Sequence, residues 1–123
     1  MMKQLHTVLP AADLRRAREF YHNTLELDPD EVHDGSVVYH LDSGAAFEIY
    51  ESSNAGTSQT TQMGWLTDDL PAEMARLREH GVVFEEYDVP GIKTENGIAQ
   101  MEDGRAAWFR DSEGNFICVS EHA

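Results

Sequence analysis

Two segments of the chain share one pattern of apolar and polar positions. Residues 6–14 form an apolar run that ends in an Asp–Leu pair, and apolar side chains then recur at helical spacing through Leu25. Residues 62–70 repeat the run with its Asp–Leu pair, and residues 71–80 repeat the helical spacing. Because Asp is a favoured residue at a helix N-cap, each copy predicts a strand followed by a capped helix. We therefore interpret the chain as an internal duplication.

The period of the apolar positions changes from about 3.6 to about 2 after each predicted helix, which is typical of β-strands. The expected strands are residues 30–33, 37–41 and 45–50 in the first half and residues 82–87, 105–110 and 116–120 in the second. We therefore predict an α+β fold in which two tandem βαβββ modules form a curled mixed sheet around a cleft.

Residues 53–60 are small and polar, as in a linker. We place the first module at residues 1–52 and the second at residues 61–123 of a single domain. Residues 89–97 are extra chain between two strands of the second module. A loop of this length is more often functional, or a cover over a cleft, than idle.

The composition excludes several classes of partner. With a formal net charge of −14, the chain would repel nucleic acid and anionic lipid surfaces. Solubility is the simplest interpretation of this charge, and a cationic ligand or a salt-rich cytoplasm is the alternative. No apolar stretch is long enough to cross a bilayer, and the first residues lack a secretion signal. The single cysteine, Cys118, excludes an intramolecular disulfide, so we expect a cytoplasmic protein.

Strand alternation assigns side chains to faces. Phe47 and Ile49 should contact the helices, so Glu48 points to the opposite, inner face. The same alternation places further side chains on inner faces: His6, His40, Tyr50, Gln62, Trp108 and Cys118. Buried polar groups without partners cost ~1–3 kcal/mol each. This set therefore indicates a ligand site more than an ordinary core.

The role of each candidate stays open at this point. His6 is either a ligand or a hydrogen-bonded structural histidine, whereas Glu48 inside an apolar strand favours a site role. Tyr50 and Trp108 either stack on a flat ligand or fill the interior. A strand cysteine without a neighbouring base or cation in sequence is more often an inert small apolar residue, which favours that interpretation of Cys118.

The order and spacing of several short motifs resemble a known family. The motifs are His6 ahead of Asp13-Leu14, the helix of residues 16–21, Phe47-Glu48-Ile49, Asp69-Leu70 and the stretch of residues 109–115. Together they resemble the vicinal oxygen chelate superfamily, which includes glyoxalase I, extradiol dioxygenases and the bleomycin and fosfomycin resistance proteins. The resemblance covers nearly the whole chain and implies a glyoxalase-like fold.

The resemblance also implies positions for a divalent metal. They are His6, Glu48, Gln62 and Cys118. The metal-binding enzymes of the family carry Glu where this chain has Cys118, and a neutral thiol is a poor replacement for a carboxylate in a hard six-coordinate site. We therefore expect either no cofactor or a weakly bound divalent metal (Zn, Ni, Mn or Fe) on the three remaining positions.

Three functional hypotheses follow. The first is a homodimeric small-molecule-binding protein of the glyoxalase, bleomycin-resistance and dioxygenase type, with a degraded metal site. Its expected ligand contacts are His40, Tyr50, Trp108, Arg110 and Cys118. The alternative is a metal-dependent lyase, isomerase or dioxygenase that uses His6 and Glu48, with Glu48 as the catalytic base. The third makes the acidic surface an adaptor for a basic protein, and whether the chain catalyses a reaction stays open.

Overall fold

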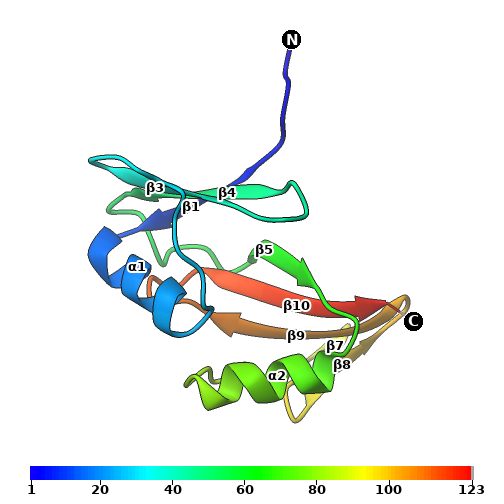
Figure 1. Ribbon diagram of the computed structural model, residues 1–123. Coiled ribbons are helices and arrows are strands. Elements are labelled where there is room, and N and C mark those ends of the chain that lie inside the picture. Colours follow the sequence, from blue (N-terminus) through cyan, green and yellow to red (C-terminus); the bar gives the residue numbers. More distant parts are fainter. Residues whose placement is uncertain (123) are drawn as a thin grey trace. The chain divides into compact units, whose positions relative to one another are not determined.

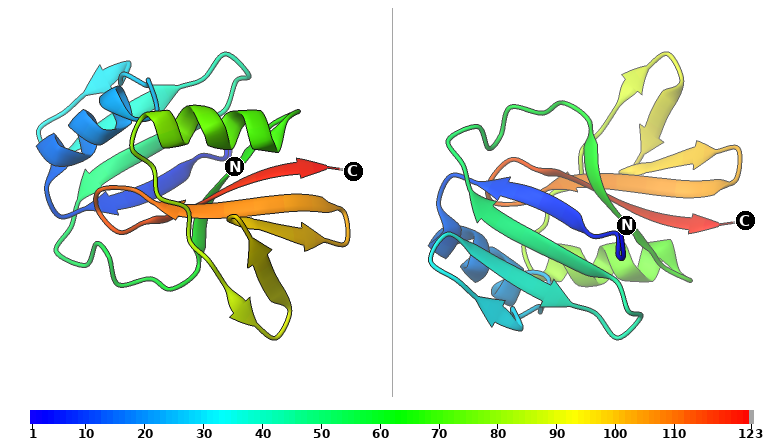
Figure 2. Two further views of the ribbon diagram at one scale, coloured as in Figure 1. Left: turned by 90° about the horizontal axis from the view of Figure 1, so that it is seen from below. Right: turned by 90° about the horizontal axis from the view of Figure 1, so that it is seen from above.

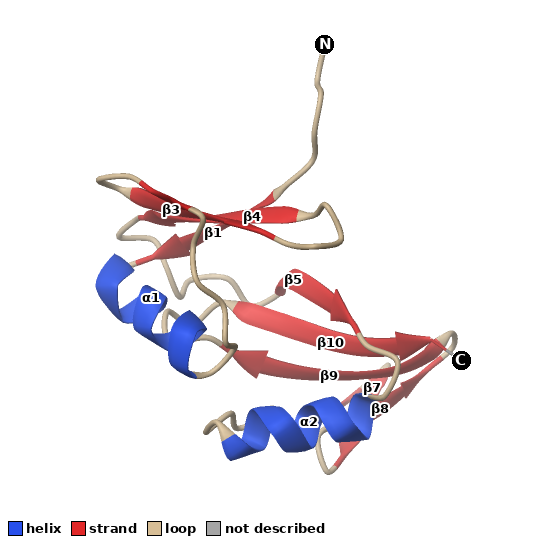
Figure 3. Cartoon of the chain, in the orientation of Figure 1, coloured by secondary structure: helices blue, strands red, loops and turns tan. Residues whose placement is uncertain are grey.

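The computed structural model describes residues 1–122; Ala123, the last residue of the expected second module, lies outside them. The chain forms two compact units. The first contains Met1–Ser58 and Asp111–Asn115, and the second contains Gln59–Arg110 and the residues from Phe116 onward. Among the described residues each unit carries one helix and one mixed β-sheet, so the α+β prediction is confirmed (Figure 3).

The sheet of the first unit has the strand order β1-β4-β3-β2 (Figure 1). Its elements are β1 (Thr7–Ala11), α1 (Leu14–Asn23), β2 (Glu31–Val32), β3 (Ser36–His40) and β4 (Ala46–Glu51). Strand β1 runs parallel to β4, whereas β3 is antiparallel to both β4 and β2. The first and last strands of the unit are therefore neighbours, although a helix and a hairpin separate them in sequence.

Helix α1 begins where the sequence predicts, because the Asp13 carboxylate accepts a hydrogen bond from the Arg16 backbone N–H (3.0 Å). Its buried face packs on the sheet, where the Tyr21 ring lies 5.7 Å from that of Phe47. The Phe47 ring in turn stacks on Tyr39 at a centroid distance of 4.4 Å. The core of the first unit thus lies between α1 and one face of its sheet.

The sheet of the second unit has the order β5-β10-β9-β8-β7-β6, with β5 parallel to β10 (Figure 2). Its elements are β5 (Thr61–Leu66), α2 (Leu70–Glu79), β6 (Asp88–Val89), β7 (Ile92–Glu95), β8 (Ile98–Met101), β9 (Gly104–Arg110) and β10 (Phe116–His122). The Asp69 carboxylate caps α2 as Asp13 caps α1. Neither α1 nor α2, the helices of residues 1–122, has the length and apolarity needed to span a membrane.

Two expectations for the second half are wrong. Residues 82–87 were predicted as a strand, but they form only an isolated bridge from Phe84 to Phe109. Val82 and Phe84 are buried while Val83 is 83% exposed, so the alternation is real. Strand β8 pairs only with Gly104–Ala106 of β9, and beyond it the segment contributes the Phe84–Phe109 bridge and one hydrogen bond, from the Glu85 N–H to the Trp108 carbonyl (2.8 Å), which is too little pairing to form a strand.

Residues 89–97 were predicted as a loop, but most of them belong to β6 and β7, which form a hairpin. The turn of this hairpin contains Gly91, whose φ of 91° lies in the left-handed region that favours glycine. Strand β8, which the sequence pattern did not predict, then pairs with both β7 and β9.

The turn Asp111–Asn115 joins two strands of the second unit but belongs by its contacts to the first. The Tyr21 hydroxyl donates a hydrogen bond of 2.7 Å to the buried Asp111 carboxylate. The Asn115 amide donates to the Pro10 carbonyl (2.9 Å) and to Asp111 (2.9 Å). The first unit is therefore completed by a segment distant in sequence.

Candidate functional site

Glu48 is one of the inner-face candidates of the first unit. This residue lies in the middle of β4, between Val8 of β1 and Val38 of β3 in the sheet register. Its neighbours Phe47 and Ile49 are buried against α1, so its side chain lies on the opposite face, as predicted. Glu48 is half-buried, and its carboxylate makes no hydrogen bond or ion pair within residues 1–122. His6 is exposed and lies immediately before β1.

His40 is engaged by acidic neighbours. Its Nε2 lies 2.8 Å from the Glu31 carboxylate, and its backbone N–H donates to Asp30. His33 Nε2 lies 3.5 Å from the other Glu31 oxygen. These histidines, His40 first, lower the pKa of Glu31. Tyr50 is 40% exposed near the end of β4, with no hydrogen bond within the described chain.

In the second unit Trp108 lies directly opposite Cys118 in the antiparallel register of β9 and β10. We call the apolar group around these two residues the Trp108 cluster; it consists of Tyr87, Ile92, Ala99, Ala106, Trp108 and Cys118. The Tyr87 ring meets the Trp108 ring edge to face at 5.8 Å, and the indole N–H donates to the Thr61 hydroxyl (3.0 Å). Ile117 and Val119 are buried on the alternate face.

The environment of Cys118 decides its chemistry. The side chain is half-buried within the Trp108 cluster, and burial raises the pKa of its thiol. Cys118 therefore remains a neutral thiol at physiological pH. A neutral thiol is neither a good metal ligand nor a good nucleophile.

The other position implied for a metal in the second unit is Gln62. Its side-chain oxygen accepts a hydrogen bond from the Phe116 backbone N–H (3.1 Å). Of the four positions implied by the family resemblance, Cys118 does not fit a hard divalent metal, whereas Gln62 offers an oxygen that would have to share or exchange this hydrogen bond. No cluster of three or more His, Cys, Asp or Glu side chains suited to a metal ion occurs within residues 1–122.

Arg110 lies two residues beyond Trp108 on the same strand. Its guanidinium pairs with Glu85 (2.8 Å) and lies over the Phe116 ring, 4.7 Å from the ring centroid. It thus supplies an anchored polar group beside the Trp108 cluster.

The structure groups the candidates by unit: His6, His40, Glu48 and Tyr50 belong to the first, and Gln62, Trp108, Arg110 and Cys118 belong to the second. Sequence reasoning missed Tyr87 and Ile92. The extra chain at residues 89–97 could have indicated Ile92, because this segment packs Ile92 against the Trp108 cluster.

Comparison with known proteins gives a family match. The profile of the Glyoxalase/Bleomycin resistance protein/Dioxygenase superfamily matches residues 3–119. No curated protein sequence matched the chain.

Several solved structures share the fold. TnmS3, an antibiotic binding protein from a Streptomyces species, aligns with a TM-score of 0.73 and 22% identity over 100% of this chain and 99% of that one. A glyoxalase/bleomycin resistance protein from Catenulispora acidiphila aligns with a TM-score of 0.68 and 23% identity over 99% of this chain and 100% of that one. A Glu-to-Gln mutant of the Listeria monocytogenes fosfomycin resistance protein FosX, complexed with Mn(II) and 1S,2S-dihydroxypropylphosphonic acid, aligns with a TM-score of 0.67 and 16% identity. The alignment covers 98% of this chain and 90% of that one. At these identities the likeness is one of fold.

Proposed function

The chain belongs to the Glyoxalase/Bleomycin resistance protein/Dioxygenase superfamily, and from that premise we propose that it binds a small planar organic molecule on the Trp108 cluster. The observation that carries this proposal is the Cys118 thiol, kept neutral by burial directly opposite Trp108 in the sheet register, where the family resemblance implies a Glu in metal-binding members. Apolar lining with a few anchored polar groups is typical of small-molecule sites.

The parts of the Trp108 cluster suit a flat ligand. Trp108 is only 9% exposed, whereas Tyr87 and Ile92 are partly buried and are the side chains through which a ligand would contact the cluster. The Thr61 hydroxyl accepts a hydrogen bond from the indole N–H, which fixes the Trp108 ring. Arg110, paired with Glu85, offers a polar contact beside the Trp108 cluster. Stacking on a fixed aromatic ring contributes about 0.5–1.5 kcal/mol beyond the buried area.

The first experiment uses the two tryptophans separately, with bleomycin as a large, cationic heteroaromatic probe. Trp65→Phe leaves only Trp108 to fluoresce, and Trp108→Phe leaves only Trp65, whose register partner Val119 is buried on the other face of the sheet. We expect bleomycin to quench the emission of Trp65→Phe and to leave that of Trp108→Phe unchanged. Tyr87→Leu should weaken binding at least ~5-fold through lost ring contact. Quenching only in Trp108→Phe would contradict the proposal.

A metal-dependent lyase, isomerase or dioxygenase is the second candidate, and the unpartnered Glu48 carboxylate favours it. In that case His6 and Glu48 would hold the metal, which would polarise substrate oxygens. Metal analysis of protein purified without chelators tests this candidate. Stoichiometric Zn, Ni, Mn or Fe that is lost in His6→Ala or Glu48→Gln would support it. Absence of metal, together with no thermal shift with these ions, would exclude it.

We further propose that the protein acts in the cytoplasm as a homodimer. The open edges of both sheets support the dimer, because exposed edge strands favour pairing. Sedimentation equilibrium tests this part, and a monomer at micromolar concentration would contradict it.

A further inference from the structure

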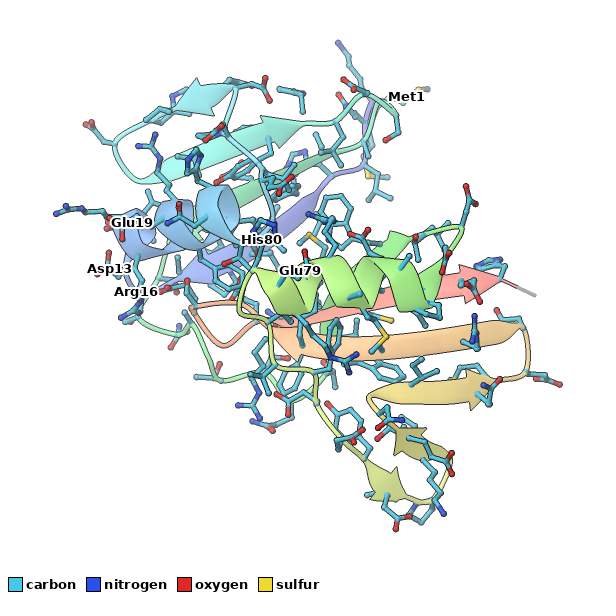
Figure 4. All side chains as sticks on the ribbon, turned by 60° about the horizontal axis from the view of Figure 1, so that its bottom comes forward. Met1, Asp13, Arg16, Glu19, Glu79 and His80 are labelled. Carbon is cyan, nitrogen blue, oxygen red and sulfur yellow. The ribbon has the colours of Figure 1, made fainter. Side chains whose placement is uncertain are left out.

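The first unit has a hollow of about 640 Å³ on the helix side of its sheet, between α1 and the segment around β2; we call it the α1 groove. Its lining includes Arg15, Arg18, Asp28, Val32, Asp34, Val37 and Glu51. Val37 pairs with Ile49, whereas Val38 pairs with Glu48, so the α1 groove and Glu48 are on opposite faces of the sheet. Glu19, labelled in Figure 4, marks this side of α1.

Arg18 stands out among the arginines. Each of the other six has a side-chain or carbonyl partner: Arg15 with Glu19, Arg16 with Glu113, Arg76 with Glu73, Arg78 with the Asn96 carbonyl, Arg105 with Glu121 and Arg110 with Glu85. Within residues 1–122 Arg18 makes no ion pair or hydrogen bond, although acidic residues outnumber basic ones 23 to 9. A guanidinium left unpaired in so acidic a chain, on the wall of a groove, is available to an external anion.

A second unsatisfied donor lies beneath the same stretch of the groove. Tyr39 is 1% exposed, and its hydroxyl has no hydrogen-bond partner. Burial raises the pKa of Tyr39 to about 12, and the nearby charges of Arg18 and Asp28 act on it in opposite directions. The hydroxyl therefore remains a donor close to two lining residues.

The groove also contains unpaired carboxylates. Asp34 and Glu51 make no side-chain hydrogen bond or ion pair within the described residues. A hydrogen bond from the Glu51 backbone N–H to the Gly35 carbonyl keeps these carboxylates at one end of the groove. This end adjoins the start of α1, because the next residue, Ser52, donates to the Ala11 carbonyl. Arg18 lies about one turn further along the helix.

We propose that the α1 groove binds a zwitterion with an apolar body, either an amino acid or a short peptide, with its carboxylate on Arg18 and its ammonium group on Asp34 and Glu51. The apolar body lies along Val32 and Val37, of which Val32 is 55% exposed. A simple dianion does not fit, because the neighbouring carboxylates would repel it. A simple cation leaves both Arg18 and Tyr39 without partners.

The experiment titrates ¹⁵N-labelled protein with L-leucine and with leucyl-leucine, which distinguishes the two sources of the zwitterion. N-acetyl-leucyl-leucine and leucyl-leucine amide remove one charge each. We expect amide shifts in residues 14–23 and 28–37 with at least one zwitterion, and at least ~10-fold weaker binding of both capped forms. No shifts by about 10 mM, shifts confined to β8–β10, or equal binding of the capped forms would overturn the proposal.

Substitutions in the α1 groove test which side chains contact the zwitterion. Arg18→Gln should weaken binding of the tighter zwitterion at least ~10-fold. Arg15→Gln is the matched control on the same groove wall, because Arg15 already pairs with Glu19; it should change binding less than ~2-fold. An equal effect of Arg15→Gln and Arg18→Gln would contradict the assignment. Because the Trp108 cluster lies in the other unit, failure here leaves the bleomycin experiment unaffected, and the reverse also holds.

Discussion

Replacement of Glu113 by Gln tests how the turn Asp111–Asn115 is held in the first unit. The Glu113 side chain is fully buried and accepts hydrogen bonds from the Asp13 backbone N–H (2.9 Å), from Arg16 Nε and Nη2 (2.8 and 2.9 Å), and from the Ser112 hydroxyl (2.8 Å). Asp13 and Arg16 lie together at the start of α1 (Figure 4). Gln keeps the size of the side chain but removes its charge and presents an amide group to the guanidinium.

The expected loss in the free energy of unfolding follows from the pKa of Glu113. Burial alone would raise this pKa, but the hydrogen bonds from Arg16, Asp13 and Ser112 outweigh burial and lower it from 4.5 to about 2. Because the folded-state pKa is depressed, the ionised carboxylate stabilises the fold at pH values above about 4.5, and this contribution is lost as the pH falls toward 2. At about 1.4 kcal/mol per pKa unit, the contribution at neutral pH is about 3 kcal/mol.

Urea unfolding followed by far-UV circular dichroism measures the effect. We expect Glu113→Gln to lower the free energy of unfolding by about 3 kcal/mol at about pH 7, and by only about 1 kcal/mol at about pH 3, where wild type has lost most of its advantage. Glu19→Gln is the control, because Glu19 makes an exposed pair with Arg15 on the same helix; it should cost at most ~0.5 kcal/mol. A cost below about 1 kcal/mol at neutral pH, or one that does not change with pH, would refute the reasoning.

Two further pairs of variants follow from the structure. Tyr21→Phe removes a hydrogen bond to the buried Asp111 carboxylate and should cost about 2 kcal/mol in urea unfolding, whereas Tyr39→Phe removes a hydroxyl without a partner and should be neutral or slightly stabilising. A larger cost for Tyr39→Phe than for Tyr21→Phe would contradict this. Gly104 has a φ of 150°, and a Cβ there would collide with the backbone of β10. Gly104→Ala should therefore lower the melting temperature by about 8 °C or more, at roughly 2 kcal/mol or above. Gly64→Ala, with no atom within 4 Å of its Cβ, should leave it nearly unchanged.

Local chemistry explains why the helices and the strand faces were predictable. Asp13 and Asp69 cap their helices through their own side chains, a contact that spans only three residues. The alternation of Phe47, Glu48 and Ile49 is likewise a property of neighbouring residues, and the burial of Phe47 and Ile49 confirms it.

The second half was harder to predict, because alternation shows which face a side chain occupies and not which strand lies alongside. Residues 82–87 alternate as a strand would, yet they pair with β9 only at the Phe84–Phe109 bridge, while β8 pairs with the other part of that edge. The β6–β7 hairpin packs Ile92 against the Trp108 cluster. Its strand pairing cannot be predicted from a local sequence pattern. The roles of His6, Glu48 and the other site candidates stay predictions.

The sequence by itself determined the duplication, the two capped helices, the α+β class and the placement of Glu48 opposite the helix-packed residues of its strand, because each depends on side chains a few positions apart. The tertiary structure alone decided that Asp111–Asn115 completes the first unit, that Cys118 is a neutral thiol beside Trp108, and that Arg18 and Tyr39 lack partners. These depend on contacts between residues far apart in the chain, and burial and charge pairing arise only when folding brings such residues together.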